Sequence, residues 1–386
     1  MRIAMRASVV ISAFVAVLVG FGGSVAIILA ATSALGATPA QTSSWIATLC
    51  VAMMATTSVL SIWHRMPIVT AWSTPGAALL AATSGLSIEA AVGGFYVAAG
   101  LILLTAAFRP LAALIDKIPG SIAAAMLAGV LFSFVVALFE HLNTAPMLVM
   151  SLLGAFLVLR LVSPMWAVLA VLALGIGLSF MLGLTSPIGA LRFSTFEWIQ
   201  PKFDVPTLVG LGVPLYLVTM ASQNLPGFAV LRAAGYQPPT QSILAVTGFA
   251  SLFSAGFGAH TSNLAAITAS ICTGPDAHPD KDKRWLCGPF YALGYAVLAL
   301  FGASVVTLFA SFPQALIVTV AGIALMGPFV GALSAGFAEE TDRFAAAGTF
   351  VVTASGLQAF GIASAFWGLV AGLLIIGLDR LKRRGE

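Results

Sequence analysis

Long apolar stretches recur along this chain from one end to the other. Each is about 18–22 residues long, which is the length a helix needs to cross the hydrocarbon core of a bilayer. The chain is 60% hydrophobic and 8% charged, and its mean hydropathy is +1.06; soluble proteins carry roughly 25% charged residues. The strands of a membrane β-barrel would be about half as long and alternate in polarity. We therefore predict an all-α integral membrane protein.

Fourteen such segments can be marked out. The first one lacks a plausible signal-peptide cleavage site and is taken as a membrane span. The predicted spans lie near 8–31, 42–62, 67–83, 89–108, 118–139, 145–162, 164–184, 206–230, 241–258, 260–273, 287–311, 313–336, 343–361 and 363–380.

The positions of the basic residues favour fourteen crossings. With a cytoplasmic N-terminus, only Arg192 and Lys202 of the 17 Lys and Arg residues fall outside. If the third and tenth segments entered and left the membrane on one side, four basic residues would move outside: Arg109, Lys117, Arg160 and Arg232. Since positive residues collect in cytoplasmic loops, the first arrangement is preferred, and both termini are predicted to be cytoplasmic.

The third and tenth segments are short and are interrupted by polar residues. The third contains Trp72, Ser73, Thr74, Pro75 and Gly76, and the tenth begins with His260–Asn263. Ser73 or Thr74 can cap a helix that starts at Pro75, and Thr261 or Ser262 can cap a second one. Helices that start inside a membrane leave N–H groups for a ligand, so paired breaks indicate a transporter site. The alternative is two kinked helices that bind nothing.

The two halves of the chain also repeat. Pro39 and Pro239 precede similar residues at the start of spans two and nine, and Pro119 and Pro313 open spans five and twelve. Seven spans per half is an odd number, so the second half must enter the membrane from the opposite side. We expect two inverted seven-span repeats, with broken half-helices in spans three and ten.

Span eight contains a polar cluster next to a proline. Ser222, Gln223 and Asn224 precede Pro226, which lacks an N–H group and clashes with the carbonyl of Ser222, so the helix must bend or open there. These side chains are candidates for substrate contact. The alternative is that they join neighbouring helices by hydrogen bonds.

His260 is the ionisable side chain that we place beside this site. Because histidine titrates near neutral pH, it is the candidate for proton coupling. A neutral imidazole bonded to a backbone carbonyl is the alternative. Three cysteines indicate no disulfide framework. There is no metal-binding, phosphate-binding or nucleophile motif, so we expect no metal, no cofactor, no enzyme activity and no nucleic-acid partner.

Two stretches carry a resemblance to a known family. Residues 222–236 and 260–268 resemble the benzoate/proton symporter family (BenE type), and more distantly the nucleobase and anion transporters with seven-plus-seven inverted repeats. The resemblance implies a core domain of residues 1–110 and 205–312 and a gate domain of residues 111–204 and 313–386. It places substrate between the half-helices, at Trp72, Ser73, Thr74, Gly76, Ser222, Gln223, Asn224, His260, Thr261, Ser262 and Asn263.

The expected function is import of benzoate or a related aromatic carboxylate with a proton, by alternating access in the inner membrane. Nucleobase relatives carry carboxylates in spans eight and ten, where this chain has Ser222, Gln223, Ser262 and Asn263. A buried carboxylate would repel an anion, so this departure favours an anionic substrate. Phe21, Phe228 and Phe257 join Trp72 as candidates to pack against the substrate ring. A nucleobase or inorganic-anion transporter remains the alternative, and the sequence leaves monomer or homodimer open.

Overall fold

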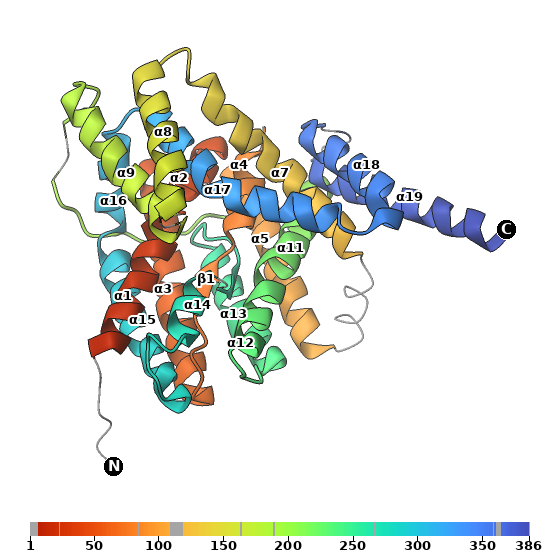
Figure 1. The fold of residues 1–386 in the computed structure, drawn as a ribbon, viewed down its shortest axis with the longest axis horizontal. Coiled ribbons are helices and arrows are strands. Elements are labelled where there is room, and N and C mark those ends of the chain that lie inside the picture. Colours follow the sequence, from red (N-terminus) through yellow and green to blue (C-terminus); the bar gives the residue numbers. More distant parts are fainter. Residues whose placement is uncertain are drawn as a thin grey trace.

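The computed structural model describes residues 7–22, 24–83, 85–108, 119–162, 164–187, 190–265, 267–357, 359 and 364–385. Its chain is mostly helical (Figure 1). The first half contains α1 (Ala7–Gly22), α2 (Val25–Ala34), α3 (Pro39–His64), α4 (Thr74–Ala81), α5 (Ile88–Ala107), α7 (Gly120–Glu140), α8 (Pro146–Val162) and α9 (Pro164–Met181). The second half contains α10 (Val205–Thr207), α11 (Val213–Thr219), α12 (Leu225–Ala233), α13 (Thr240–Ala255), α14 (Ile267–Thr273), α15 (Cys287–Leu300), α16 (Gly302–Ala310), α17 (Gln314–Gly336), α18 (Arg343–Ala354) and α19 (Ser364–Gly385).

Each predicted span contains at least one of these helices. Six helices in the described residues are long and apolar enough to cross a membrane, or seven if α15 and α16, which meet at a 60° bend, form one span. Four shorter apolar helices are α8, α9, α13 and α19. The protein is therefore a multi-pass membrane protein, while fourteen crossings stay a prediction. The predicted domain boundary at residues 110 and 111, with Arg109 and Lys117, lies outside the described residues.

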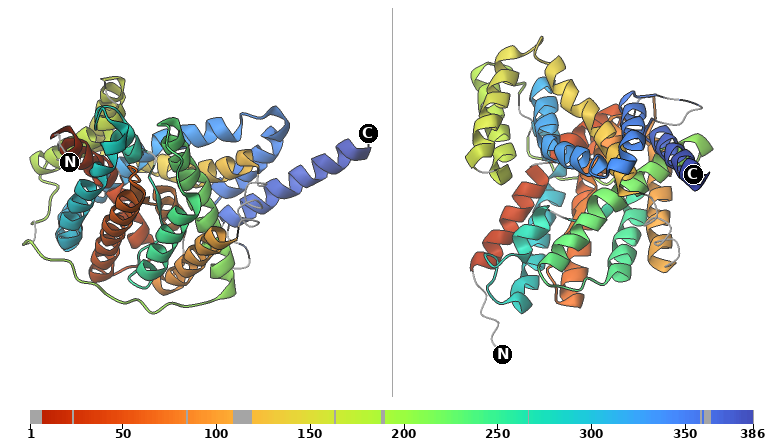
Figure 2. Two further views of the ribbon diagram at one scale, coloured as in Figure 1. Left: turned by 90° about the horizontal axis from the view of Figure 1, so that it is seen from below. Right: turned by 45° about the vertical axis from the view of Figure 1, so that its right-hand side comes forward.

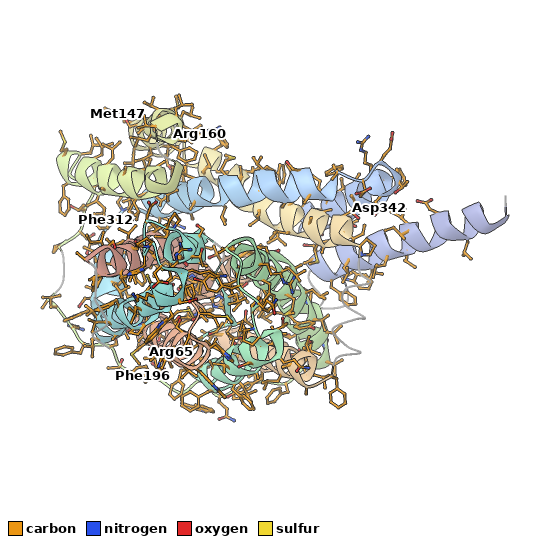
Figure 3. All side chains as sticks on the ribbon, turned by 60° about the horizontal axis from the view of Figure 1, so that its bottom comes forward. Arg65, Met147, Arg160, Phe196, Phe312 and Asp342 are labelled. Atoms are coloured by element: carbon orange, nitrogen blue, oxygen red, sulfur yellow. The ribbon has the colours of Figure 1, made fainter. Side chains whose placement is uncertain are left out.

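The helices pack in two groups. A central group consists of α1–α5 and α10–α16, in which α3 packs on α15 and α5 packs on α13. An outer group consists of α7–α9 and α17–α19, in which α7 packs on α17 and α18. Figure 3 shows the outer group as a layer above the central group, with Met147 and Arg160 on its far side and Asp342 at one end. The two groups meet where α7 contacts α4 and where α17 contacts α2.

Two short strands lie in the middle of the central group (Figure 1). Strand β1 (Thr70–Trp72) pairs antiparallel with β2 (Ser262–Leu264), with Ala71 opposite Asn263 and Trp72 opposite Ser262. Strand β1 leads into α4, and β2 precedes α14, which begins at Ile267. The prediction that Thr261 or Ser262 caps this helix is wrong, because both residues lie at the strand, at least five positions before it. This pairing brings together the two polar clusters that the sequence analysis singled out.

An extended segment, residues 190–204, runs along the outside of the central group (Figure 2). Its backbone is fixed by bonds from Ile199 N to Gly256 O and from Lys202 N to Glu89 O. Gly256 makes room for the Trp198 ring, which a Cβ there would meet at 2.1 Å. The segment therefore holds together helices that are distant in sequence.

Candidate functional site

The free edge of β1 is closed by side chains. Thr57 Oγ1 on α3 accepts a hydrogen bond from Thr70 N at 3.0 Å, and Tyr291 on α15 donates its hydroxyl hydrogen to Thr70 O at 2.9 Å. Unpaired backbone groups inside a membrane cost several kcal/mol each. These two side chains remove that cost and fix β1 to α3 and α15.

The free edge of β2 is closed in the same way. Ser251 Oγ on α13 accepts from Ser262 N at 2.8 Å, and Asn224 Oδ1 accepts from Leu264 N at 3.0 Å. The Asn224 amide also donates to Met220 Sδ at 3.3 Å. Asn224 therefore supports the strand pair through its oxygen, while its nitrogen bonds within its own helical turn.

The first turn of α4 is capped as the sequence predicts. Ser73 Oγ accepts from Gly76 N at 3.0 Å, and Ser73 O accepts from Ala77 N at 2.8 Å. Pro75 has no N–H group. Thr74, which is half-buried, is thus the residue in this turn whose N–H is left for a ligand, with its own hydroxyl beside it.

His260 joins three elements of the central group. Its Nδ1 accepts from the Trp45 indole Nε1 at 3.1 Å, and its Nε2 lies 3.0 Å from Ser73 O. An indole N–H can only donate, so Nδ1 carries no proton and the hydrogen on Nε2 is donated to Ser73 O. The residue is fully buried. A second proton on the ring would place two N–H groups face to face and break the Trp45 bond.

The helix around Ser222–Asn224 opens as expected from Pro226. Residues Met220–Asn224 form a π-helical turn, η2, immediately before α12. Such turns replace the regular hydrogen-bond pattern and often occur at functional sites. Ser222 and Gln223 are half-buried there, and η2 contacts α7 of the outer group.

Two buried polar atoms on β2 remain unpaired. Ser262 Oγ and Asn263 Oδ1 have no hydrogen-bond partner in the described part of the chain, and both residues are fully buried. The Asn263 amide donates to Leu264 O at 2.8 Å, which can only accept, so the orientation of the amide is fixed. Buried acceptors without a donor are rare in proteins and call for an explanation.

Some predicted aromatic residues gather beside α4 and others do not. Trp72 makes edge-to-face contacts with Phe21 on α1 at 5.8 Å and with Tyr295 on α15 at 6.0 Å, and its indole donates to Ser24 Oγ. Phe257 packs instead against Trp198 at 5.5 Å. Phe228, the remaining candidate, lies near the Arg232 guanidinium.

The far end of α14 is fixed by a loop. Arg284 donates from Nη1 to Thr273 O at 2.6 Å and from Nε to His278 O at 2.7 Å. Tyr236, in the loop after α12, donates to Lys281 O at 2.8 Å, and burial raises the pKa of Tyr236 to about 12. A hydrogen bond from Lys283 lowers the pKa of the exposed Asp280.

The predicted site residues thus fall into two sets. Trp72, Ser73, Asn224, His260 and Thr261 hold the framework, the last through a 2.7 Å bond between its hydroxyl and that of Thr219. The remaining predicted residues are not part of this framework, except that Gly76 N bonds to the Ser73 cap: Thr74, Gly76, Ser222, Gln223, Ser262 and Asn263. Their contact with substrate stays a prediction.

Several framework residues were missed by the sequence analysis: Thr57, Trp45, Ser251, Tyr291 and Tyr295. Each lies within an apolar helix, and its partner lies on another element. Among the described residues, no three His, Cys, Asp or Glu side chains are grouped so that they could hold a metal ion.

Comparison with known protein families gives a match over almost the whole chain. Residues 4–378 match the model of the family described as benzoate membrane transport protein, BenE. The chain is 41% identical over 365 residues to the inner membrane protein YdcO of Escherichia coli (strain K12), covering 94% of this chain and 93% of that protein. It is 37% identical over 369 residues to the benzoate membrane transport protein of Acinetobacter baylyi, covering 95% and 94%.

Solved structures share the fold at low sequence identity. The transmembrane domain of the cyanobacterial bicarbonate transporter BicA superposes with a TM-score of 0.63 at 14% identity, covering 94% of this chain and 97% of that one. The murine anion transporter Slc26a9, in its inward-facing state, gives a TM-score of 0.64 at 13% identity, covering 99% of this chain and 69% of that one. The fold is therefore that of these membrane transporters. By its family match, the chain belongs to the benzoate membrane transport protein family, whose members are membrane transporters and not enzymes.

Proposed function

We propose that this protein imports benzoate or a related aromatic carboxylate together with a proton. The observation that carries the proposal is an aromatic cluster whose central residue directly precedes a capped helix start. Trp72, which packs against Phe21 and Tyr295, lies two residues before Thr74 at the beginning of α4. An aromatic carboxylate has a ring for the cluster and a polar group for the helix start.

The charges of the two segments support a carboxyl substrate. No Lys or Arg occurs in residues 70–81 or 260–273, so a carboxyl group would be held by neutral donors. The start of a helix carries about half a positive charge, which favours electron-rich oxygens. Ser73 caps the start of α4, so the proposal places the carboxyl group at this helix.

Transport by alternating access would move the central group against the outer group. In this proposal the central group acts as the core domain and the outer group as the gate domain. Each group packs within itself through long helix pairs, and α4 and η2 of the central group both contact α7. We propose that substrate sits at this boundary and becomes accessible to each side in turn, with fourteen crossings and both termini in the cytoplasm.

The decisive experiment is uptake of labelled benzoate into membrane vesicles with an imposed pH gradient. We expect accumulation when the outside is acidic, inhibition by ring-substituted benzoates and no competition by uracil. Accumulation should collapse when a protonophore removes the gradient. Uptake of uracil or bicarbonate, without uptake of benzoate, would contradict the proposal and favour one of the alternatives.

A further inference from the structure

Asn263 presents an acceptor at the proposed site, which limits the form of the substrate that can bind. Its amide NH2 donates one hydrogen bond to Leu264 O, and the oxygen Oδ1 is the atom of the group that has no partner. A carboxylate has only acceptor oxygens, and one placed against Oδ1 would be repelled. A carboxylic acid has an O–H that Oδ1 can accept.

The register of the strands places Asn263 opposite Ala71, two residues before the cap of α4 at Ser73. Residues directly opposite in an antiparallel pair have side chains on the same face. Asn263 is opposite Ala71, and Ala71 is the half-buried residue of β1 between two buried neighbours. Thr74, with its remaining N–H, follows three residues after Ala71. The strand pair and the start of α4 therefore offer one acceptor, at Asn263, and one donor, at Thr74.

We infer that the protein binds the protonated acid, with Asn263 Oδ1 accepting the acid O–H and Thr74 N donating to the acid carbonyl. The inference rests on the proposed function and extends it to the form of the substrate. The proton then crosses on the substrate itself. It is taken up with benzoate on the acidic side and released to water when the acid ionises on the other side.

The groups around Asn263 do not offer another carrier. Residues 70–72, 220–224, 240–255 and 39–64, which make up the elements packed against β2, contain no Asp, Glu, Lys or Arg. The titratable groups there are Cys50 and His64 on α3, with His260 before β2 and Tyr291 on α15. His260 has both ring nitrogens in hydrogen bonds, Tyr291 donates to Thr70 O, and His64 Nε2 bonds to Ser242 Oγ at 2.8 Å.

The test uses the purified full-length protein in detergent and measures binding by calorimetry. We expect one proton to be taken up per benzoate bound, and the affinity for total benzoate to fall tenfold per pH unit above the pKa of the acid. Benzamide, a neutral analogue with an N–H donor, should compete with an affinity that does not change with pH. Benzenesulfonate, a permanent anion with the same ring, should not compete.

Variants separate the substrate from the protein as the source of the pH dependence. Asn263→Leu should weaken benzoic acid and benzamide by the same factor, about tenfold or more for one buried hydrogen bond. His260→Gln should keep the tenfold slope. The ligand series on the unaltered protein decides the matter if Asn263→Leu does not fold.

Two results would overturn the inference, and they differ in what else they affect. Benzoate affinity that is constant with pH, no proton uptake and competition by benzenesulfonate would mean that the anion binds; the proposed function would stand. No benzoate binding by folded protein at any pH would overturn the proposed function and this inference with it.

Discussion

Residues 70–81 and 262–273 each place a three-residue strand before a short helix, but their polar groups are used differently. In the first segment, the two oxygens of Ser73 accept hydrogen bonds from Gly76 N and Ala77 N, and His260 also donates to Ser73 O. In the second, Ser262 Oγ and Asn263 Oδ1 stay unpaired. The polar groups of the first segment are therefore fixed by hydrogen bonds, and we call residues 73–77 the fixed platform. The second segment supplies the two side chains that have no partner.

The far ends of the two helices differ as well. Helix α14 is tied to a loop of its own group, through Arg284 and Thr273. Helix α4 ends against the outer group, where Leu79 and Thr83 border a cavity of about 60 Å³ with Gly129 and Thr353 of α7 and α18. A displacement of the outer group would thus act directly on α4. We therefore predict that α4 tolerates little change in the shape of its side chains. We also predict that the position of α14 depends on the loop that holds its far end.

The largest effect is expected at the fixed platform. A Cβ at Gly76 would lie 2.7 Å from Leu215 Cδ1 and 2.8 Å from Ser73 Oγ, so Gly76→Val must displace the cap. Overpacking costs up to about 3 kcal/mol, which corresponds to ~100-fold in affinity. We expect benzoate binding to fall by this factor while the protein still inserts.

A matched control is Gly100→Val, because Gly100 lies on α5 with no atom within 4 Å of an added Cβ. It should bind benzoate normally. If Gly76→Val binds benzoate as tightly as Gly100→Val does, the helix start of α4 is not the site, and the distinction between the two segments fails.

The link between the two segments should give the next largest effect. Trp45→Phe removes the indole N–H from His260 Nδ1 and leaves that nitrogen without its donor. Loss of one such bond costs about 1–1.5 kcal/mol, so affinity should fall ~10-fold. If the proton crosses on the substrate, Trp45→Phe and His260→Gln both keep accumulation driven by an acidic outside. The control is Trp63→Phe, since Trp63 is 70% exposed.

If His260 has the proton-coupling role predicted from the sequence, the uptake assay should give a different result. If His260 carries the proton, His260→Gln retains benzoate exchange and loses pH-driven accumulation. Trp45→Phe would then free Nδ1 and move the pH profile to a higher pH. Either result would restore His260 as the coupling residue and remove the need for a neutral substrate.

The sequence could predict those parts of the site that depend on neighbouring residues. The cap at Ser73, with Pro75 behind it, and the opening of the helix before Pro226 follow from local chemistry, and the structure contains both. The hydrogen bond that Asn224 accepts from Leu264 N could not be predicted, because the two residues are 40 positions apart. The same holds for Trp45 and His260, which are 215 residues apart. An apolar pattern marks where helices lie and leaves open which polar side chain meets which.

A smaller effect is expected at the loop that holds α14. Arg284→Gln removes the charged donor from Thr273 O and His278 O. For a half-buried group we expect a loss of about 1.5 kcal/mol, or a melting temperature lower by ~3–6 °C. Arg284→Lys should recover part of the lost stability. Benzoate affinity should change less in Arg284→Gln than in Trp45→Phe, because the strand pair holds the other end of α14. A loss of affinity as large as that of Gly76→Val would mean that the loop controls the site.

The smallest effect is expected at the neighbouring ion pair of the same loop. Lys283 Nζ lies 3.1 Å from Asp280 Oδ2, and both side chains are about 40% exposed, so solvent weakens the attraction. The hydrogen bond from Lys283 lowers the pKa of Asp280 in the folded protein. The pair therefore stabilises the fold above the ordinary aspartate pKa of about 3.9, and this contribution is lost as pH falls through the lower folded value.

We expect Lys283→Gln to melt within error of the unaltered protein at pH 7 and to show no difference at pH 3. Thermal melts of both proteins across this range test it. A loss at pH 7 as large as that of Arg284→Gln would mean that the ion pair, and not the arginine bonds to Thr273 and His278, fixes the end of α14.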